Sequence, residues 1–292
     1  MSPFVDEANC PAVDIPQPNP NPSRNQRITS GMELSPLSLI TSGTHLVPPN
    51  ILLHGVAGVG KTTFAANSIK PVVVSTEDGL GVLDVPHFPL ATSFEEVIAD
   101  LQALHVEAHD YQTVVIDSVD WLEPLVWART CSENNWENLE APGYGKGYTA
   151  ALDVWRDYLG WLDALRNDRG MTVIQIAHTD IRRFDDPERD PYDRYLIKLH
   201  ARASALLQEH ADVVLFANYR ISTVKSDVGF NKKVTRALGS GARVLYTKER
   251  PAFLAKNRFK LPDSMDLDWS VFADAMPHFP TTNKPATEEK EA

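Results

Sequence analysis

The residues with the most recognisable chemistry lie in one glycine-rich stretch near position 55. Gly55, Gly60, Lys61 and Thr62 fit the phosphate-binding pattern G-x-x-x-x-G-K-S/T. Such a loop turns its backbone N–H groups toward phosphate oxygens, which requires residues without bulky side chains. The lysine reaches the β- and γ-phosphates of a nucleotide, and the threonine hydroxyl binds Mg²⁺. The predicted nucleotide-binding residues are Gly55, Val56, Ala57, Gly58, Val59, Gly60, Lys61, Thr62 and Thr63.

The segments on either side of this loop predict a strand before it and a helix after it. Residues 51–53 form a short apolar run, and Thr62 to Ile69 contain no helix breaker. A helix at this place adds the positive end of its dipole to the phosphate site. The alternative is a glycine-rich turn with an exposed lysine, and the flanking elements argue against it.

Three further polar residues follow apolar runs that predict strands. Glu77 follows the run PVVVS, Asp117 ends the run TVVID, and His178 follows the run MTVIQIA. Parallel strands place their carboxyl ends at one edge of the sheet, where α/β proteins bind ligands. We therefore expect these three side chains beside the phosphate loop.

Each of the three has a chemical role and a structural alternative. Asp117 is positioned to serve Mg²⁺ together with Thr62, or else it caps the next helix. Glu77 is the candidate general base for an attacking water, or else a solvated acid in a turn. His178 is a candidate sensor of the γ-phosphate, or else a structural histidine at a strand end.

The order of predicted elements indicates an α/β fold with a mostly parallel central sheet and helices on both faces. Ser93 begins a capping box, and a second helix is predicted from Ala151 to Arg166 with a stop at Gly170. A long loop is predicted from Thr179 to about Leu196. Two strands are predicted on either side of a turn at residues 239–241, and a last short strand at residues 253–256.

Composition suggests one large domain with tails. The chain has 292 residues and a net charge of −11, so any contact with nucleic acid must be local. No apolar run approaches eighteen residues, the N-terminus does not read as a secretory signal, and two distant cysteines make no disulfide framework. We expect a cytoplasmic protein without a membrane segment. The expected division is a flexible segment 1–45, a core 46–262 and a polar C-terminal extension 263–292 with a frayed end.

Four segments in this order resemble the RecA-type ATPase core, a RecA-like P-loop NTPase: GVAGVGKT, VVVSTED, TVVIDSVDWL and VIQIAH. More narrowly, they resemble core-only phage members, some of which are ATP-dependent single-strand annealing recombinases. The resemblance covers about residues 48–262. It implies ATP hydrolysis in which Glu77 activates water and Asp117 serves Mg²⁺. It also implies that His178 couples the γ-phosphate to a DNA-binding loop that follows it.

The resemblance further implies two loops that contact DNA. In the first, Lys146 can meet a phosphate, and Tyr144 and Tyr148 can stack on bases; the alternative is a hinge whose tyrosines pack on the protein. The second, residues 180–202, carries six cations and six acids, so only Arg182 and Arg183 form a basic pair.

Residues 255–259, AKNRF, are similar to the Lys-Asn-Arg motif of RecA-fold motors such as bacterial RadA and hexameric replicative helicases. In those proteins the lysine and arginine reach the nucleotide of an adjacent subunit. The similarity implies that Lys256 and Arg258 act in a neighbouring copy, and hence that the chain forms a homo-oligomeric ring or filament. The alternative is a basic strand end at the surface.

The leading hypothesis is a phage-type recombination ATPase that binds ATP, Mg²⁺ and single-stranded DNA in the host cytoplasm. Other phage recombination or replication proteins are possible partners. The second hypothesis is a motor or loader ATPase of replication that acts on a protein. The third is a small-molecule kinase, which Glu77, His178 and the Lys256–Arg258 stretch disfavour because they suit hydrolysis and subunit coupling.

Overall fold

A computed structural model describes residues 47–187, 190–227 and 233–279, together with residues 37, 40 and 42. By backbone contacts the chain divides into residues 1–43 and residues 44–292, and the helices and strands named below belong to the second unit. The predicted flexible segment 1–45 lies almost entirely outside the described residues, and so do residues 280–292 of the predicted C-terminal extension.

The central sheet has the strand order β2-β3-β4-β1-β6-β7-β9, with β5 paired to β4 and β8 paired to β6. The pairs β2–β3, β3–β4, β4–β1 and β1–β6 are parallel, which confirms the predicted parallel core. The remaining pairs are antiparallel. The strands are β1 (Asn50–Gly55), β2 (Pro71–Ser75), β3 (Thr113–Asp117), β4 (Thr172–Phe184), β5 (Tyr192–Ile197), β6 (Val213–Asp227), β7 (Lys233–Tyr246), β8 (Lys256–Asn257) and β9 (Ser264–Asp266).

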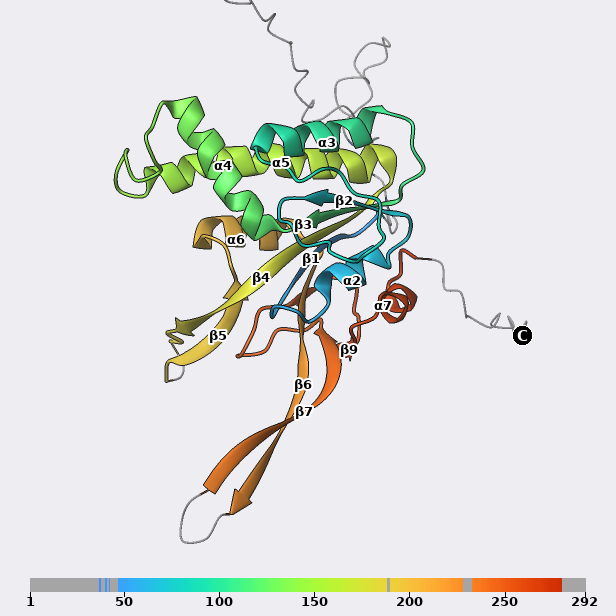
Figure 1. Ribbon diagram of the computed structural model, residues 1–292, viewed down its shortest axis with the longest axis vertical. Coiled ribbons are helices and arrows are strands. Elements are labelled where there is room, and N and C mark those ends of the chain that lie inside the picture. Colours follow the sequence, from blue (N-terminus) through green and yellow to red (C-terminus); the bar gives the residue numbers. More distant parts are fainter. Residues whose placement is uncertain are drawn as a thin grey trace, which may run out of the picture. The chain divides into compact units, whose positions relative to one another are not determined.

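Helices cover both faces of this sheet. Figure 1 shows α3, α4 and α5 together on one side, and α2 and α7 on the other. The helices are α2 (Lys61–Ala66), α3 (Phe94–Val106), α4 (Val119–Asn134), α5 (Lys146–Arg169), α6 (Ala201–His210) and α7 (Trp269–Ala275). The two faces have separate cores, because successive strand residues point to opposite sides. Leu52 packs under α3 to α6, whereas Ile51 and Leu53 pack with α2 and α7.

Local sequence signals account for the helix ends. The hydroxyl of Ser93 accepts a hydrogen bond from the backbone N–H of Glu96, and the Glu96 carboxylate accepts one from the N–H of Thr92. This confirms the predicted start of α3. Gly170 caps α5 with a φ of 66°, which confirms the predicted stop.

The start of α5 was predicted too late. The helix begins at Lys146 rather than Ala151. Gly147 lies inside this helix. A Cβ at this position would come within 2.1 Å of the backbone oxygen of Leu139, so only glycine fits there. The glycine permits a close approach between two backbones, not a turn.

A predicted loop after His178 and a predicted turn at residues 239–241 are also wrong. β4 does not end at His178 but continues to Phe184, and residues 179–184 pair with β5 where a loop was expected. β7 is one strand, and Gly239 within it pairs with Ile221 of β6, next to a register shift after Tyr219. Figure 1 shows both resulting hairpins, β4–β5 and β6–β7, leaving the body of the sheet. The predicted strand 253–256 overlaps the observed strand β8, Lys256–Asn257, only at Lys256.

The segment after residue 262 contributes to the core, which its polar composition did not indicate. β9 adds a strand at the edge of the sheet beside β7. Trp269 and Phe272 of α7 pack against Phe64 of α2, with ring centroids 5.4 and 5.7 Å from it. α7 therefore supports the helix that follows the phosphate loop.

Candidate nucleotide site

The glycine-rich loop joins the end of β1 to the start of α2. Gly55 pairs with His178 of β4, and a Cβ on Gly55 would lie 2.2 Å from the backbone oxygen of Ala217 in β6. Gly60 has a φ of 103° immediately before α2, a conformation that side chains other than glycine's rarely adopt. Val59 is fully buried and anchors the loop in the core. α2 itself is six residues long and ends before the predicted Ile69.

Lys61 lies beneath this loop. Its side chain is nearly buried, and its Nζ donates hydrogen bonds to the backbone oxygens of Gly55 at 3.1 Å and Val56 at 3.3 Å. Burial lowers the pKa of the Lys61 ammonium, while the nearby charge of Asp117 opposes the change. The loop therefore holds a positive charge at its centre, as the phosphate-binding pattern predicts.

Thr62 and Asp117 meet beside the loop. The Thr62 hydroxyl donates a 2.7 Å hydrogen bond to Oδ2 of Asp117, and Oδ1 of this carboxylate is buried without a hydrogen-bond partner among the described residues. An unpartnered buried oxygen typically costs ~1–3 kcal/mol, so its presence indicates a ligand. Burial raises the pKa of Asp117, and the bond from Thr62 opposes this rise.

These two residues fit Mg²⁺. The ion keeps several waters and takes one or two protein oxygens together with substrate phosphates. Within the described residues no group of three or more His, Cys, Asp or Glu side chains forms a metal site, so the protein offers no dedicated cage. A hydroxyl, one carboxylate and a phosphate-binding loop are the donors that a nucleotide-bound Mg²⁺ requires.

His178 and Glu77 lie on the neighbouring strand ends, and a third residue joins them. Nδ1 of His178 lies 3.9 Å from the Glu77 carboxylate and 3.0 Å from Oδ2 of Asp120, whose side chain is only 2% exposed. Asp120 also accepts a 2.9 Å hydrogen bond from the backbone N–H of His178. The structure thus brings Glu77, Asp117 and His178 to one edge of the sheet.

Asp120 was missed as a site residue. The available signal was its position three residues after Asp117, which places it on the first turn of a helix leaving the same strand end. A helix start directs side chains back over the sheet edge, so Asp120 reaches the strand beside it.

Charges within this cluster shift one another's pKa. The hydrogen bond to Asp120 raises the pKa of His178 above 6.5, although burial acts in the opposite direction. Burial alone would raise the pKa of Asp120, but its hydrogen bonds from the ring and backbone of His178 bring it below 3.8. Burial raises the pKa of Glu77 above 4.5, and the charge of His178 opposes this. The cluster favours a protonated imidazole next to Asp120, with a more basic carboxylate beside it.

The three residues predicted for the first DNA loop have different environments. Tyr144 is fully exposed, and Lys146 is exposed at the start of α5. Tyr148 lies within α5, where its ring stacks on His200 with centroids 4.1 Å apart and meets the edge of Trp127. Tyr148 therefore packs on the protein, as the hinge alternative predicts for it, whereas Tyr144 and Lys146 face solvent.

The basic pair of the second predicted loop lies on the hairpin extension of β4. Arg182 forms an ion pair with Asp180 at 3.0 Å, and Arg183 forms one with Asp185 at 3.4 Å. Arg182 also approaches the backbone oxygen of Leu199, just before α6. Each arginine is thus matched by an acid on its own hairpin.

Lys256 and Arg258 lie toward the opposite end of the parallel strands from the phosphate loop of the same chain. Lys256 pairs with Val214 near the start of β6, whereas Gly55 of the loop pairs with Ala217, further along that strand. The ammonium of Lys256 donates to the backbone oxygens of Gln208, Glu209 and Ala211 at the end of α6. Arg258 pairs with Asp212 at 3.1 Å, and its side chain remains 53% exposed.

Comparison with known proteins places the chain in a family. A family model described as an AAA domain matches residues 48–259. The chain belongs to this AAA domain family. No protein of curated function matches it. Among solved structures, the crystal structure of the RadB recombinase is similar, with 18% identity, coverage of 70% of this chain and 84% of that chain, and a TM-score of 0.35.

The chain is accordingly an AAA-type P-loop ATPase with an α/β fold and a mostly parallel central sheet. β4 separates the P-loop strand β1 from β3, which carries Asp117, so His178 emerges between the two. None of the helices in the described part of the chain is long and apolar enough to cross a membrane.

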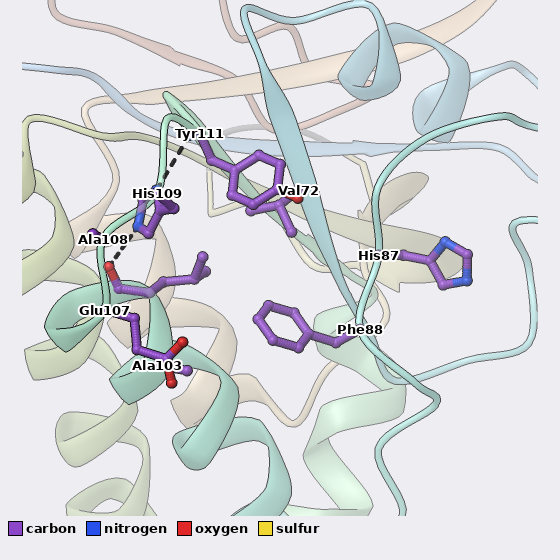
Figure 2. Close-up of a pocket in the computed structure, with 9 residues that line it drawn as sticks. Val72, His87, Phe88, Ala103, Glu107, Ala108, His109 and Tyr111 are labelled. Atoms are coloured by element: carbon purple, nitrogen blue, oxygen red, sulfur yellow. Dashed lines mark hydrogen bonds between the residues drawn. The ribbon is translucent and has the colours of Figure 1, made fainter.

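A cavity of about 230 Å³ in this AAA-domain ATPase lies away from the nucleotide edge. Val72 and Tyr111, near the amino ends of β2 and β3, line it together with Phe88. Figure 2 shows the Phe88 and Tyr111 rings facing the cavity, while both ring nitrogens of His109 bond to backbone atoms at its rim. The cavity is largely apolar and contributes nothing to phosphate chemistry.

Proposed function

We propose that this AAA-type ATPase hydrolyses ATP and uses hydrolysis to bind and anneal single-stranded DNA during recombination. The observation that carries the proposal is the continuity of β4. The strand passes His178 at the phosphate edge and runs without a break into the hairpin that carries Arg182 and Arg183. One element thus connects the position expected to contact the γ-phosphate with the position expected to contact DNA.

The chemistry assigned to the site is attack of water on the γ-phosphate. Glu77 accepts a proton from that water, and its raised pKa makes it a stronger base than an exposed carboxylate. Nδ1 of His178 is held by Asp120, which leaves Nε2 to donate a hydrogen bond to a γ-phosphate oxygen. Lys61 places positive charge at the β- and γ-phosphates. Mg²⁺, held through Thr62 and Asp117, supplies neutralisation of phosphate charge when bound.

Contact with DNA is assigned to a local surface because the chain carries a net charge of −11. Tyr144 offers a fully exposed ring for stacking, typically worth ~1–3 kcal/mol per base, and Lys146 offers a cation two residues away. Arg182 and Arg183 add the basic pair on the hairpin. Exchange of their aspartate partners for phosphates would make the contact dependent on salt.

The active form is proposed to be a homo-oligomer. The position of Arg258, which pairs with Asp212 at the other end of the strands from its own P-loop and is half exposed, supports a role at a neighbouring subunit's nucleotide. Lys256 is a weaker candidate for that role, since its ammonium already donates to three carbonyl oxygens at the end of α6.

A second candidate function, a motor or loader that acts on a protein partner, uses the same nucleotide site. The ion pairs of Arg182 and Arg183 with aspartates of their own hairpin favour it, because a charge-balanced hairpin offers DNA no net attraction.

ATPase activity measured with and without single-stranded DNA across a salt series separates these functions. Recombination activity predicts stimulation by DNA that declines steeply between about 50 and 200 mM salt. The Lys61→Ala variant provides the control for contaminating activity. An ATPase that ignores DNA at every salt concentration would contradict the DNA proposal while leaving the hydrolytic site intact. Phosphate transfer to a nucleoside would contradict both.

A further inference from the structure

The side of the P-loop away from β4 is formed by β6 and β7. Tyr219 of β6 and Arg243 of β7 are partners in the register of this pair, immediately before the register shift. The Tyr219 hydroxyl donates a 3.0 Å hydrogen bond to the backbone oxygen of Gly58. A Cβ placed on Gly60 would lie 2.7 Å from Nη1 of Arg243. The loop is therefore held by a tyrosine and covered by a guanidinium.

Among the described residues, no ion pair joins Arg243 to an acidic side chain. Arg243 is exposed. Asp266, beside the next residue of β7, lies 3.9 Å from Arg220 instead. The acids of the nucleotide site, Glu77, Asp117 and Asp120, belong to the β2 and β3 ends of the sheet, on the other side of β1.

We propose that Arg243 binds a phosphate group of the nucleotide held in the P-loop of its own subunit. This inference rests on the proposed nucleotide site. A planar guanidinium next to the loop matches the paired oxygens of a phosphate, and the phosphate would supply the negative charge that no described residue brings to Arg243 in an ion pair. The contact comes from β7, whereas Arg258 is assigned to a neighbouring subunit.

The position of Arg243 also selects which phosphates it contacts. Glu77 and His178 mark the γ-phosphate end of the proposed site; Glu77 follows β2, and His178 lies on β4. Arg243 lies on the opposite side of β1, over Gly60. It is therefore placed for the α- and β-phosphates, which ATP and ADP share. Removal of the Arg243 side chain should weaken the binding of ATP and of ADP to the same extent.

Equilibrium binding of MgATP and MgADP to the full-length chain tests the inference. Arg243→Ala should raise both Kd values about tenfold, the loss expected for one charge-assisted hydrogen-bond pair. Arg243→Lys should restore part of the affinity, because it keeps the charge but not the planar fork. The matched control is Arg220→Ala, which removes an exposed arginine one residue after Tyr219 and should leave both Kd values unchanged. Equal Tm values of the ligand-free proteins show that Arg243→Ala leaves the fold intact.

Three outcomes would overturn the inference: Kd values within twofold of wild type, a loss confined to MgATP, or recovery of binding on mixing Arg243→Ala with Lys61→Ala chains. The last would place Arg243 at a neighbour's site. Wild-type chain that binds neither nucleotide refutes the proposed function itself, whereas wild-type binding with an unaffected Arg243→Ala variant refutes only the role of Arg243.

Discussion

At the scale of single residues, Asp120 holds the His178 side chain at the sheet edge beside the P-loop. It accepts hydrogen bonds from both the backbone and the ring of His178, so it sets the position and the charge of the imidazole together. Oε2 of Glu77 lies 3.9 Å from the same ring nitrogen of His178, Nδ1. The proposed base and the proposed hydrogen-bond donor are separate side chains, and each can be tested separately.

Glu77→Gln should remove the proton acceptor and leave the phosphate loop unchanged. We expect kcat for ATP hydrolysis to fall by ~10²- to 10⁴-fold, with the Kd of MgATP within a few-fold of wild type. Single-turnover hydrolysis and equilibrium binding measure the two quantities. The exposed neighbour Asp78 provides the matched control, as Asp78→Asn should retain turnover. Undiminished hydrolysis by Glu77→Gln would eliminate the assigned base.

Asp120→Asn should lower the pKa of His178, because it removes the carboxylate that raises it. The imidazole would then lose its proton at a lower pH, and the alkaline limb of the kcat profile would move to lower pH. A pH–rate profile checks this shift. An alkaline limb that stays in place would show that His178 does not act as a proton-bearing donor.

The same substitution has a stability signature. The raised pKa of His178 contributes stability that is fully present below about pH 6.5 and is lost as pH rises through the folded-state pKa. The lowered pKa of Asp120 contributes stability above about pH 3.8 that is lost as pH falls through its folded-state pKa. The Tm deficit of Asp120→Asn should therefore be largest between these limits and shrink at alkaline pH, as thermal melts would show.

At the scale of elements, the parallel core was predictable because its strands are buried on both faces and read as unbroken apolar runs. The hairpins were not. Residues 179–184 have charged and exposed side chains, so their strand comes from pairing with β5 rather than from a hydrophobic pattern. Gly147 and Gly239 resembled loop glycines but lie inside a helix and a strand. Glu77, Asp117 and His178 could be found from strand ends. Asp120 was indicated only by its place three residues after Asp117, and Arg243 required the register of β6 and β7.

The start of α5 carries a test of the predicted DNA loop. Tyr144→Ala should weaken binding of single-stranded DNA by roughly 5- to 100-fold if its exposed ring stacks on a base. Tyr148→Ala should chiefly lower Tm, because that ring packs on His200 and Trp127. Fluorescence anisotropy with labelled oligonucleotides and thermal melts give the two readouts. Equal DNA affinity for Tyr144→Ala and wild type would remove this loop from the interface.

At the scale of the whole molecule, the P-loop and the Lys256–Arg258 stretch lie at different ends of the strands. A site completed by Arg258 therefore requires a second copy of the chain. Arg258→Ala should lower the assembled ATPase rate by at least ~10³-fold if the arginine neutralises transition-state charge. Mixing Arg258→Ala with Lys61→Ala chains should recover part of the activity, because some interfaces then combine an intact P-loop with an intact arginine.

Steady-state rates of the mixture against each variant alone measure this recovery, and light scattering verifies that mixed assemblies form. Mixed assemblies without recovery would place Arg258 outside the neighbour's site. Lys256→Ala is expected to act differently, lowering Tm through loss of its bonds to the end of α6.

Because β4 is continuous, a movement at His178 would be carried along the strand into its hairpin extension. No glycine or proline interrupts residues 172–184, and the parallel ladders end near His178. Beyond His178, the six residues 179–184, roughly 20 Å long, are paired with β5 alone. A tilt of about 5° at His178 would displace the far end of this segment by roughly 2 Å. Amide hydrogen exchange should therefore be slow in residues 172–178 and fast in residues 179–184. A bound nucleotide that restrains His178 should slow exchange in residues 179–184 without contacting them.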